Sequence, residues 1–311
     1  MRAVVVREFG DPARLDITDV PVPDPGPQQV RIAVTAAGIN PVDTFNIQDP
    51  SWAGLEVGCV PGFDVSGLVD AVGSGLDPRL VGRPVIAMTP FPRGQGGYAE
   101  FAVVDESLVA YLDDGVDVVA AASIPLAAGT AWEVVRHVRN AGPSVLVVGA
   151  SGGVGLFFLQ LAAQSGLRPV ALGRQRNHDV MAELGAAHCV DYTQPGSIAL
   201  AAELAGGQFD SIVDLAGGAT TAAAQQFLRD DGVVCAIATP ELDVDALIDH
   251  NQTFHGVLIR DDGQRLRLLA SRYNAGNLRT HVTHQLPLED VAAAHRLLDS
   301  GEAAGKVVLT T

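Results

Sequence analysis

Lysine is nearly missing from this sequence. Lys306 is the single lysine among 311 residues, and acidic residues outnumber basic ones by 36 to 20, which gives a net charge of −16. Nucleic acids and anionic membranes bind basic surfaces, so this charge argues against both as partners. An anionic cofactor would have to be held by local hydrogen-bond donors, because the overall field is unfavourable.

Long apolar runs and paired cysteines are also missing. Although 48% of the residues are apolar, no run of about 20 residues lacks charges and turn residues, as a membrane span would. The opening MRAVVVREFGDPARL has no apolar signal segment, which predicts a cytoplasmic protein. Cys59, Cys189 and Cys235 are isolated, so they form neither a disulfide framework nor a structural zinc cluster, and we expect them to be small core residues.

Up to about residue 115 the sequence is typical of a β-rich domain. Short β-type runs such as VRIAVTAAG and VSGLVDAVG alternate with clusters rich in proline and glycine, such as PVPDPGPQQ. These clusters carry turn chemistry. We therefore expect a barrel-like domain with little helix.

From about Pro125 the pattern changes to alternating helices and strands. Helical patterns such as LFFLQLAAQSG and TTAAAQQFLRD are separated by short apolar runs such as VLVVG and GVLIR. This alternation predicts an α/β fold with a parallel sheet covered by helices on both faces. The tail predicts a strand over 279–287, a helix over 288–299 and a final strand, KVVLT.

The strongest local motif is VLVVGASGGVGLFFLQLAAQSG, which starts at Val145. Its glycine spacing, G-x-x-G-x-x-G, is weak evidence alone, and a tight turn without a ligand is the alternative. A buried strand before the glycines and a helix after them match a dinucleotide-binding turn, where the backbone approaches a pyrophosphate at the helix start. The expected cofactor-binding residues are Gly149, Ser151, Gly152, Gly153, Val154 and Gly155.

The next predicted strand ends in ALGRQRN, where proteins that bind NAD carry an acidic residue about 20 residues beyond the motif. Here Gly173, which we expect to leave room for a 2′-phosphate, is followed by Arg174 and Arg176. No carboxylate repels a 2′-phosphate, and a guanidinium can bind one, so the sequence predicts NADPH. The alternative is that both arginines lie in a solvated loop.

Seven motifs in the same order make nearly the whole chain resemble a known family, the zinc-independent quinone oxidoreductases of the medium-chain dehydrogenase/reductase superfamily. The motifs are AAGINPVDTF, PGFDVSGLVDAVGSGL, GGYAEFAVV, IPLAAGTAWEVV, ASGGVG, ELGAAHCVDY and GKVVLT. The resemblance implies a GroES-like catalytic domain over residues 1–120 and 280–311 and a Rossmann, doubly wound NADPH-binding domain over 121–279. It also implies a homodimer, for which FHGVLI (254–259) is a candidate edge strand.

Differences from related sequences bear on metal and substrate. Zinc-bearing alcohol dehydrogenases have a cysteine at Asn40 and a Gly-His-Glu at residues 62–64, where this chain has Gly-Phe-Asp. Without that thiolate and imidazole, the catalytic zinc site cannot be assembled, so the prediction is a zinc-independent protein. Phe45 replaces a frequent tyrosine, which leaves the substrate open. Asn177 lies near a frequent lysine, whose loss leaves phosphate binding to the two arginines.

The resemblance also implies roles for individual residues. Asn40 would hold the nicotinamide carboxamide or ribose, the alternative being a turn-forming residue before proline. Asp43 would orient Asn40 or relay a proton, the alternative being an acid at a helix N-terminus. Thr130 would face the nicotinamide. Tyr192 would lie near the adenosine phosphate, the alternative being a packed aromatic residue.

These expectations converge on hydride transfer to a conjugated acceptor. Without zinc, nothing lowers the pKa of an alcohol hydroxyl, whereas a quinone or enone accepts a hydride directly. We therefore predict an NADPH-dependent quinone oxidoreductase whose partner is a small quinone or conjugated carbonyl compound. Two alternatives stay open: an NADPH-dependent enone or enoyl (alkenal) reductase, and a nucleotide-binding scaffold or sensor with little turnover.

Overall fold

The computed structural model describes residues 1–92 and 96–311, and the chain divides into two compact units. The first unit contains Met1–Gly129 and Arg260–Thr311, and the second contains Thr130–Ile259. The second unit is thus inserted before the last segment of the first. The expected boundaries at residues 120 and 280 differ from this division, because residues 121–129 and 260–279 group with the first unit.

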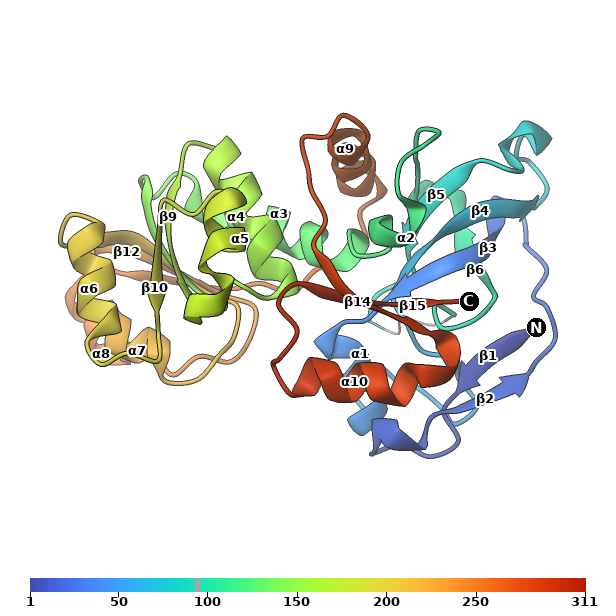
Figure 1. Ribbon diagram of the computed structural model, residues 1–311, viewed down its shortest axis with the longest axis horizontal. Coiled ribbons are helices and arrows are strands. Elements are labelled where there is room, and N and C mark those ends of the chain that lie inside the picture. The colour runs from blue at the N-terminus through green and yellow to red at the C-terminus, as the bar shows by residue number, and fades with distance from the viewer. Residues whose placement is uncertain (93–95) are drawn as a thin grey trace. The chain divides into compact units, whose positions relative to one another are not determined.

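The first unit is built on a seven-stranded sheet with the order β14-β15-β3-β4-β5-β7, and β6 pairs with β3 as well. Its β3, β4, β5 and β6 were expected from the β-type runs, and β14 and β15 from the tail, whereas β7 was not expected. The strands are β3 (Gln29–Gly38), β4 (Asp64–Val72), β5 (Pro84–Met88), β6 (Phe101–Asp105), β7 (Val109–Tyr111), β14 (Val282–Pro287) and β15 (Lys306–Thr310). A separate pair, β1 (Arg2–Val5) and β2 (Asp16–Asp19), lies beside α10 (Val291–Asp299) in Figure 1.

Alternate side chains of β3 form the apolar core on one face of this sheet. Val30, Ile32 and Val34 are at most 5% exposed and lie on one face, as the two-residue period of a strand requires. They pack with Val65 of β4 and Val85 of β5 in one apolar cluster. The helices of this unit are α1 (Pro41–Gln48), α2 (Val118–Ala121), α9 (Gly263–Asn274), α10 and the start of α3 (Pro125–Val138).

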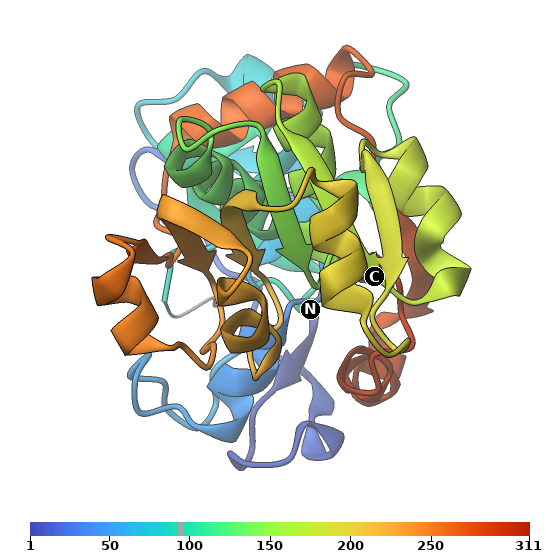
Figure 2. The same cartoon turned by 90° about the vertical axis from the view of Figure 1, so that its left-hand side faces the viewer.

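The second unit is a six-stranded sheet with the order β10-β9-β8-β11-β12-β13, in which every neighbouring pair is parallel. The strands are β8 (Ser144–Val148), β9 (Arg168–Gly173), β10 (His188–Asp191), β11 (Phe209–Asp214), β12 (Leu228–Ala236) and β13 (Thr253–Gly256). The helices are α4 (Gly153–Gln164), α5 (His178–Glu183), α6 (Ser197–Leu204), α7 (Thr220–Gln225) and α8 (Val244–Asp249). In Figure 1, α6 lies on one side of β10, and α4 and α5 lie on the other. Figure 2 shows this unit with its yellow and orange helices in front of the sheet.

Two local predictions in the second unit are wrong. The helical pattern TTAAAQQFLRD is helical only to Gln225, because Leu228 opens β12, pairs opposite Phe209 and is buried in the core. The run GVLIR is not a strand beyond Gly256, because the chain leaves the sheet there and enters the first unit at Arg260. Tertiary contacts override local propensity in both places.

No helix within the described residues is long and apolar enough to cross a membrane. Of the three cysteines, which are free thiols, Cys235 is fully buried, and Cys59 and Cys189 are partly buried. Burial raises the pKa of all three thiols, that of Cys235 to about 12. Such thiols are poor nucleophiles at neutral pH.

Candidate active site

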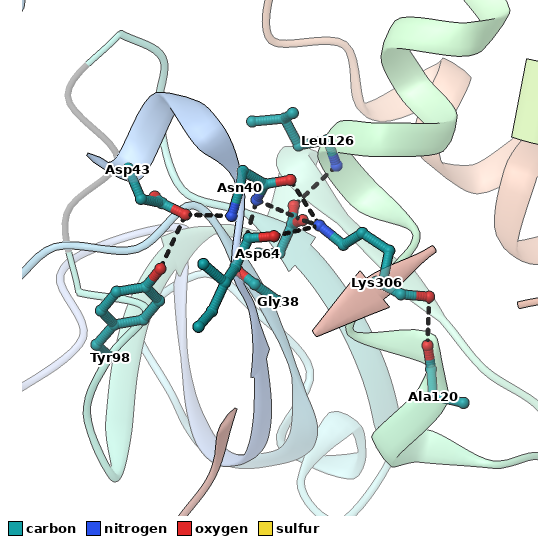
Figure 3. A network of polar contacts seen from close by, with 10 residues as sticks. Gly38, Asn40, Asp43, Asp64, Tyr98, Ala120, Leu126 and Lys306 are labelled. Carbon is teal, nitrogen blue, oxygen red and sulfur yellow. Dashed lines mark hydrogen bonds and ion pairs between the residues drawn. The ribbon is translucent and has the colours of Figure 1, made fainter. Parts of the chain in front are cut away.

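Strand register brings three polar residues together at one end of the first unit's sheet. In the pairing of β3 with its neighbours, Gly38 lies opposite both Asp64 of β4 and Val308 of β15. Continuing the antiparallel register by two residues places Lys306 opposite Asn40. Figure 3 shows the resulting network, in which side chains from distant parts of the sequence point toward one another.

The ammonium group of Lys306 is at the centre of this network. Its Nζ donates hydrogen bonds to Ile39 O at 2.8 Å and Asn40 Oδ1 at 2.6 Å, and lies 3.4 Å from Asp64 Oδ2. Lys306 is only 4% exposed. Burial lowers the pKa of Lys306, and the nearby carboxylate of Asp64 acts in the opposite direction. The single lysine is therefore a buried group whose amino nitrogen has three oxygen neighbours, which suits an ammonium group.

Asp64 joins this cation to the first turn of α3. Its Oδ2 accepts a hydrogen bond from Asn40 Nδ2 at 2.9 Å, and its Oδ1 accepts one from the Leu126 backbone N–H at 2.8 Å. Burial raises the pKa of the fully buried Asp64, while the charge of Lys306 and the bond from Asn40 counteract that rise. Both of its oxygens are thus occupied by groups of the protein.

Asp43, in the first turn of α1, is held by two donors on the same oxygen. Its Oδ2 accepts hydrogen bonds from the Asn40 backbone N–H at 2.8 Å and from Tyr98 OH at 2.9 Å. The other oxygen, Oδ1, is buried and has no hydrogen-bond partner among the described residues. Burial raises the pKa of Asp43 to about 7, although the two hydrogen bonds oppose the rise. Asp43 therefore titrates near neutral pH.

The structure brings the two predicted catalytic residues, Asn40 and Asp43, together. The Asn40 side chain is 2% exposed, accepts from Lys306, and directs its amide toward Asp64 and, at 3.4 Å, Gly38 O. Both amide hydrogens thus have acceptors within the protein. The contact between Asn40 and the nicotinamide stays a prediction.

Three members of this network escaped the sequence analysis as functional candidates: Tyr98, Lys306 and Asp64. Tyr98 is fully buried, and burial, followed by the charge of Asp43, raises its pKa well above the usual value. The signals in the sequence were the rarity of lysine and the place of all three residues in the motifs GGYAEFAVV, PGFDVSGLVDAVGSGL and GKVVLT. Their meeting depends on pairing between β3, β4 and β15, which local patterns do not show.

An aromatic cluster lies in the same unit. Phe63 is fully buried and stacks against Phe91, with ring centroids 5.5 Å apart. Trp52 contacts the same Phe91 ring at 5.7 Å and is 45% exposed. The Phe91 backbone N–H donates to Asp261 Oδ1 at 2.9 Å, which ties this cluster to the start of the returning segment. The cluster thus extends from the core to the surface.

Zinc does not fit the positions that hold it in the alcohol dehydrogenases. Phe63 offers no donor atom, Asn40 and Asp64 offer only oxygens, and those oxygens already bind the ammonium group. Zinc prefers sulfur and nitrogen ligands in tetrahedral sets. Among the described residues, no group of three or more His, Cys, Asp or Glu side chains could hold a metal.

The glycine turn of the second unit fits a pyrophosphate. Gly149 has φ +79°, and a Cβ at Gly155 would lie 2.4 Å from the carbonyl oxygens of Gly149 and Ala150, so glycine is required at both positions. Gly152 is the N-cap of α4 and has no side chain to cap it. The free N–H groups of the first helical turn, which includes Gly153 and Val154, therefore suit an anion. Ser151 lies in the same turn.

Arg174 and Tyr192 meet beyond the ends of β9 and β10. Arg174 Nε donates to Tyr192 OH at 3.2 Å, and Tyr192 is 49% exposed, so it is not a packed core aromatic. Arg176 is exposed in the 3-10 turn Gln175–Asn177. These groups could hold a phosphate together. Thr130 is 5% exposed in α3.

The expected reason for Gly173 needs correction. A Cβ at Gly173 would lie 2.5 Å from Cε of Met181, so the glycine makes room for the packing of α5. The argument for a 2′-phosphate therefore depends on Arg174, Arg176 and Tyr192 rather than on space at Gly173.

A carboxylate near these groups was also missed. Asp191 pairs opposite Gly173, its Oδ1 accepts from Thr193 N and Oγ1, and its Oδ2 accepts from Gln175 N at 3.3 Å. The hydrogen bonds from Thr193 lower its pKa, so it carries a negative charge at neutral pH. Asp191, the acidic residue in HCVDY, was the signal that the sequence offered. Its charge opposes phosphate binding beside Arg174.

Comparison with known proteins covers both units. Residues 26–114 match the family model of the alcohol dehydrogenase GroES-like domain, and residues 184–309 match that of the zinc-binding dehydrogenase. The quinone oxidoreductase of Lama guanicoe is 32% identical over 323 residues, covering 99% of this chain and 97% of the relative.

Solved structures agree with this result along the full chain. A crystal structure of an NAD-dependent alcohol dehydrogenase has a TM-score of 0.92 at 29% identity, and a mycobacterial protein in complex with NADPH has 0.87 at 28%. Each comparison covers 100% of both chains. The GroES-like domain and the Rossmann-like parallel sheet are thus confirmed.

Fold and sequence together define an oxidoreductase of the medium-chain dehydrogenase/reductase superfamily. Within that superfamily, the chain belongs to the quinone oxidoreductase-like family.

Proposed function

We propose that the protein is a zinc-independent NADPH:quinone oxidoreductase. The observation that carries this proposal is the closed network around Lys306, because it occupies the oxygens of Asn40 and Asp64 with an ammonium group. Without a Lewis acid, an alcohol or a simple ketone is poorly activated, whereas a quinone delocalises the incoming negative charge itself. Hydride and one proton together convert the quinone to its hydroquinone.

NADPH, when bound, supplies the hydride. The turn from Gly149 to Gly155 would bind the pyrophosphate through backbone N–H groups, and Arg174, Arg176 and Tyr192 would hold the 2′-phosphate. Thr130 would face the nicotinamide. These local donors matter because the net charge of −16 repels an anionic ligand.

Asn40 and Asp43 would serve the reaction from the first unit. Asp43 accepts the Asn40 backbone N–H and so orients the residue proposed to face the nicotinamide. Its pKa of about 7 suits a group that gains and loses a proton at working pH. The exposed ring of Trp52 is tilted against Phe91, which stacks on Phe63, and it offers a face for a planar conjugated acceptor.

The protein would act as a homodimer in the cytoplasm. The edge strand β13 and its surroundings expose Phe254, Leu258 and, on α8, Ile248, which is 70% exposed. An open edge with apolar neighbours favours pairing with a second copy. Three free thiols fit a reducing compartment. Sedimentation of the parent and of Ile248→Glu tests the dimer.

A panel of acceptors tests the reaction. NADPH oxidation is followed at steady state with small quinones, enones and unconjugated ketones. We expect quinones to support rapid oxidation and ketones to support none. Faster turnover with enones would favour an alkenal reductase, absence of turnover with tight NADPH binding would favour a sensor, and rapid ketone reduction would contradict the proposal.

A further inference from the structure

The network holds two carboxyl groups and only one amine. Asp43, whose pKa is about 7, and Asp64 lie near the amino group of Lys306, and the exposed fraction of each of the three residues is 4% or less. A buried charge is costly unless it is paired and hydrogen-bonded. Keeping the chain's single lysine at this place therefore needs an explanation beyond the stability of an ion pair, which an apolar replacement often matches.

The contacts of the ammonium group indicate what it fixes. It binds the backbone of Ile39 and the side chain of Asn40, which together form the junction between β3 and α1. It also lies against Asp64, whose second oxygen receives the first-turn N–H of α3 at Leu126. One cation thus reaches the starts of two helices, and α3 is the helix that contains Thr130.

We propose that Lys306 is a positioning residue of the reductase site: its ammonium group fixes Asn40 directly and the start of α3 through Asp64. This inference rests on the proposed function for its catalytic consequence. The ammonium group of Lys306, rather than a metal ion, holds the junction between β3 and α1. The geometry for hydride transfer depends on this junction. The groups facing the ammonium are Asp64 and Asp43, and Tyr98 faces it only through Asp43.

Lys306→Met tests the proposal, since it keeps the length and removes the charge. We expect single-turnover hydride transfer from NADPH to a quinone to slow by about 10- to 100-fold, given how steeply rate depends on placement. NADPH affinity should change much less than the rate, because the groups proposed to bind the pyrophosphate and the 2′-phosphate lie in the second unit. Arg31→Met is the control: it removes a cation from the ion pair between Arg31 on β3 and Asp70 on β4 and should transfer hydride like the parent.

The double variant Lys306→Met/Asp64→Asn separates positioning from charge balance. Removing both charges should restore stability, but the rate should stay low, because Asn40 Oδ1 still lacks its donor. Recovery of the parent rate in the double variant, or an unchanged rate in Lys306→Met, would overturn the proposal. If Lys306→Met does not fold, the rate of hydride transfer in the double variant tests the proposal.

A measurement without turnover distinguishes failure of this inference from failure of the proposed function. Without Lys306, the pKa of Asp64 in the folded state should rise further, so the fold binds an extra proton. The free energy of unfolding of Lys306→Met should then fall more steeply than that of the parent as pH rises above the ordinary aspartate pKa of 3.8, and the double variant should lose the part of this excess slope that comes from Asp64. Equal slopes in Lys306→Met and the parent would overturn the inference even if no acceptor is reduced.

Discussion

Replacing Arg174 by alanine should separate NADPH from NADH. The guanidinium lies beside Tyr192 at an exposed site, and the proposed phosphate contact is one charge-assisted hydrogen bond. Such a bond contributes about 1.5–3 kcal/mol, or roughly 10- to 150-fold in affinity. Solvent screening at an exposed position and the negative charge of Asp191 favour the lower end, about 10-fold.

The assay is a fluorescence titration of both cofactors with the parent and with Arg174→Ala. We expect the Kd of NADPH to rise about 10-fold and that of NADH to change little. Arg168→Ala, at the opposite end of β9, is the control and should leave both values unchanged. Equal losses for the two cofactors would show that Arg174 has a structural role, and a parent that prefers NADH would refute the reasoning.

The remaining predictions concern charge, orientation and pH. Asp191→Asn removes a negative charge beside Arg174 and should tighten NADPH by about two- to fivefold at low salt, with a smaller gain at high salt; no gain at low salt would exclude the charge effect. Asn40→Ala should lower single-turnover hydride transfer at saturating NADPH by about 10- to 100-fold, with NADPH affinity measured separately by titration; a parent-like rate would remove Asn40 from the mechanism. The raised pKa of Asp43, about 7 against an ordinary 3.8, means that the folded state binds a proton more tightly, so the free energy of unfolding should fall as pH rises from about 4 to 7. Urea titrations should show this slope in the parent and its loss in Asp43→Asn.

Local patterns were enough to predict the parallel sheet and the glycine turn of the second unit. The strand β8, the glycine turn and α4 follow one another along the chain, so their chemistry is visible in one short segment. The alternation of helices and short apolar strands likewise predicted the parallel sheet. Arg174 and Tyr192 were chosen separately, and the structure places them in contact.

The buried network could not be predicted in this way. Lys306 meets Asp64 because β3 pairs with both β4 and β15. Tyr98 joins the network because Asp43, in the first turn of α1, accepts its hydrogen bond. These contacts span up to 266 positions between Asn40 and Lys306. The wrong assignment at Leu228 has the same origin, since only its neighbours in the core make that residue a strand residue.

The most direct test of a metal-free reductase is a single-turnover reaction in chelator-treated buffer. NADPH deuterated at the transferred position is mixed with the protein and a small quinone, and hydroquinone formation is followed by rapid absorbance measurement. We expect undiminished formation, slowed by the deuterium and unaffected by added zinc. A reaction that stops after chelation and returns with zinc would contradict the account.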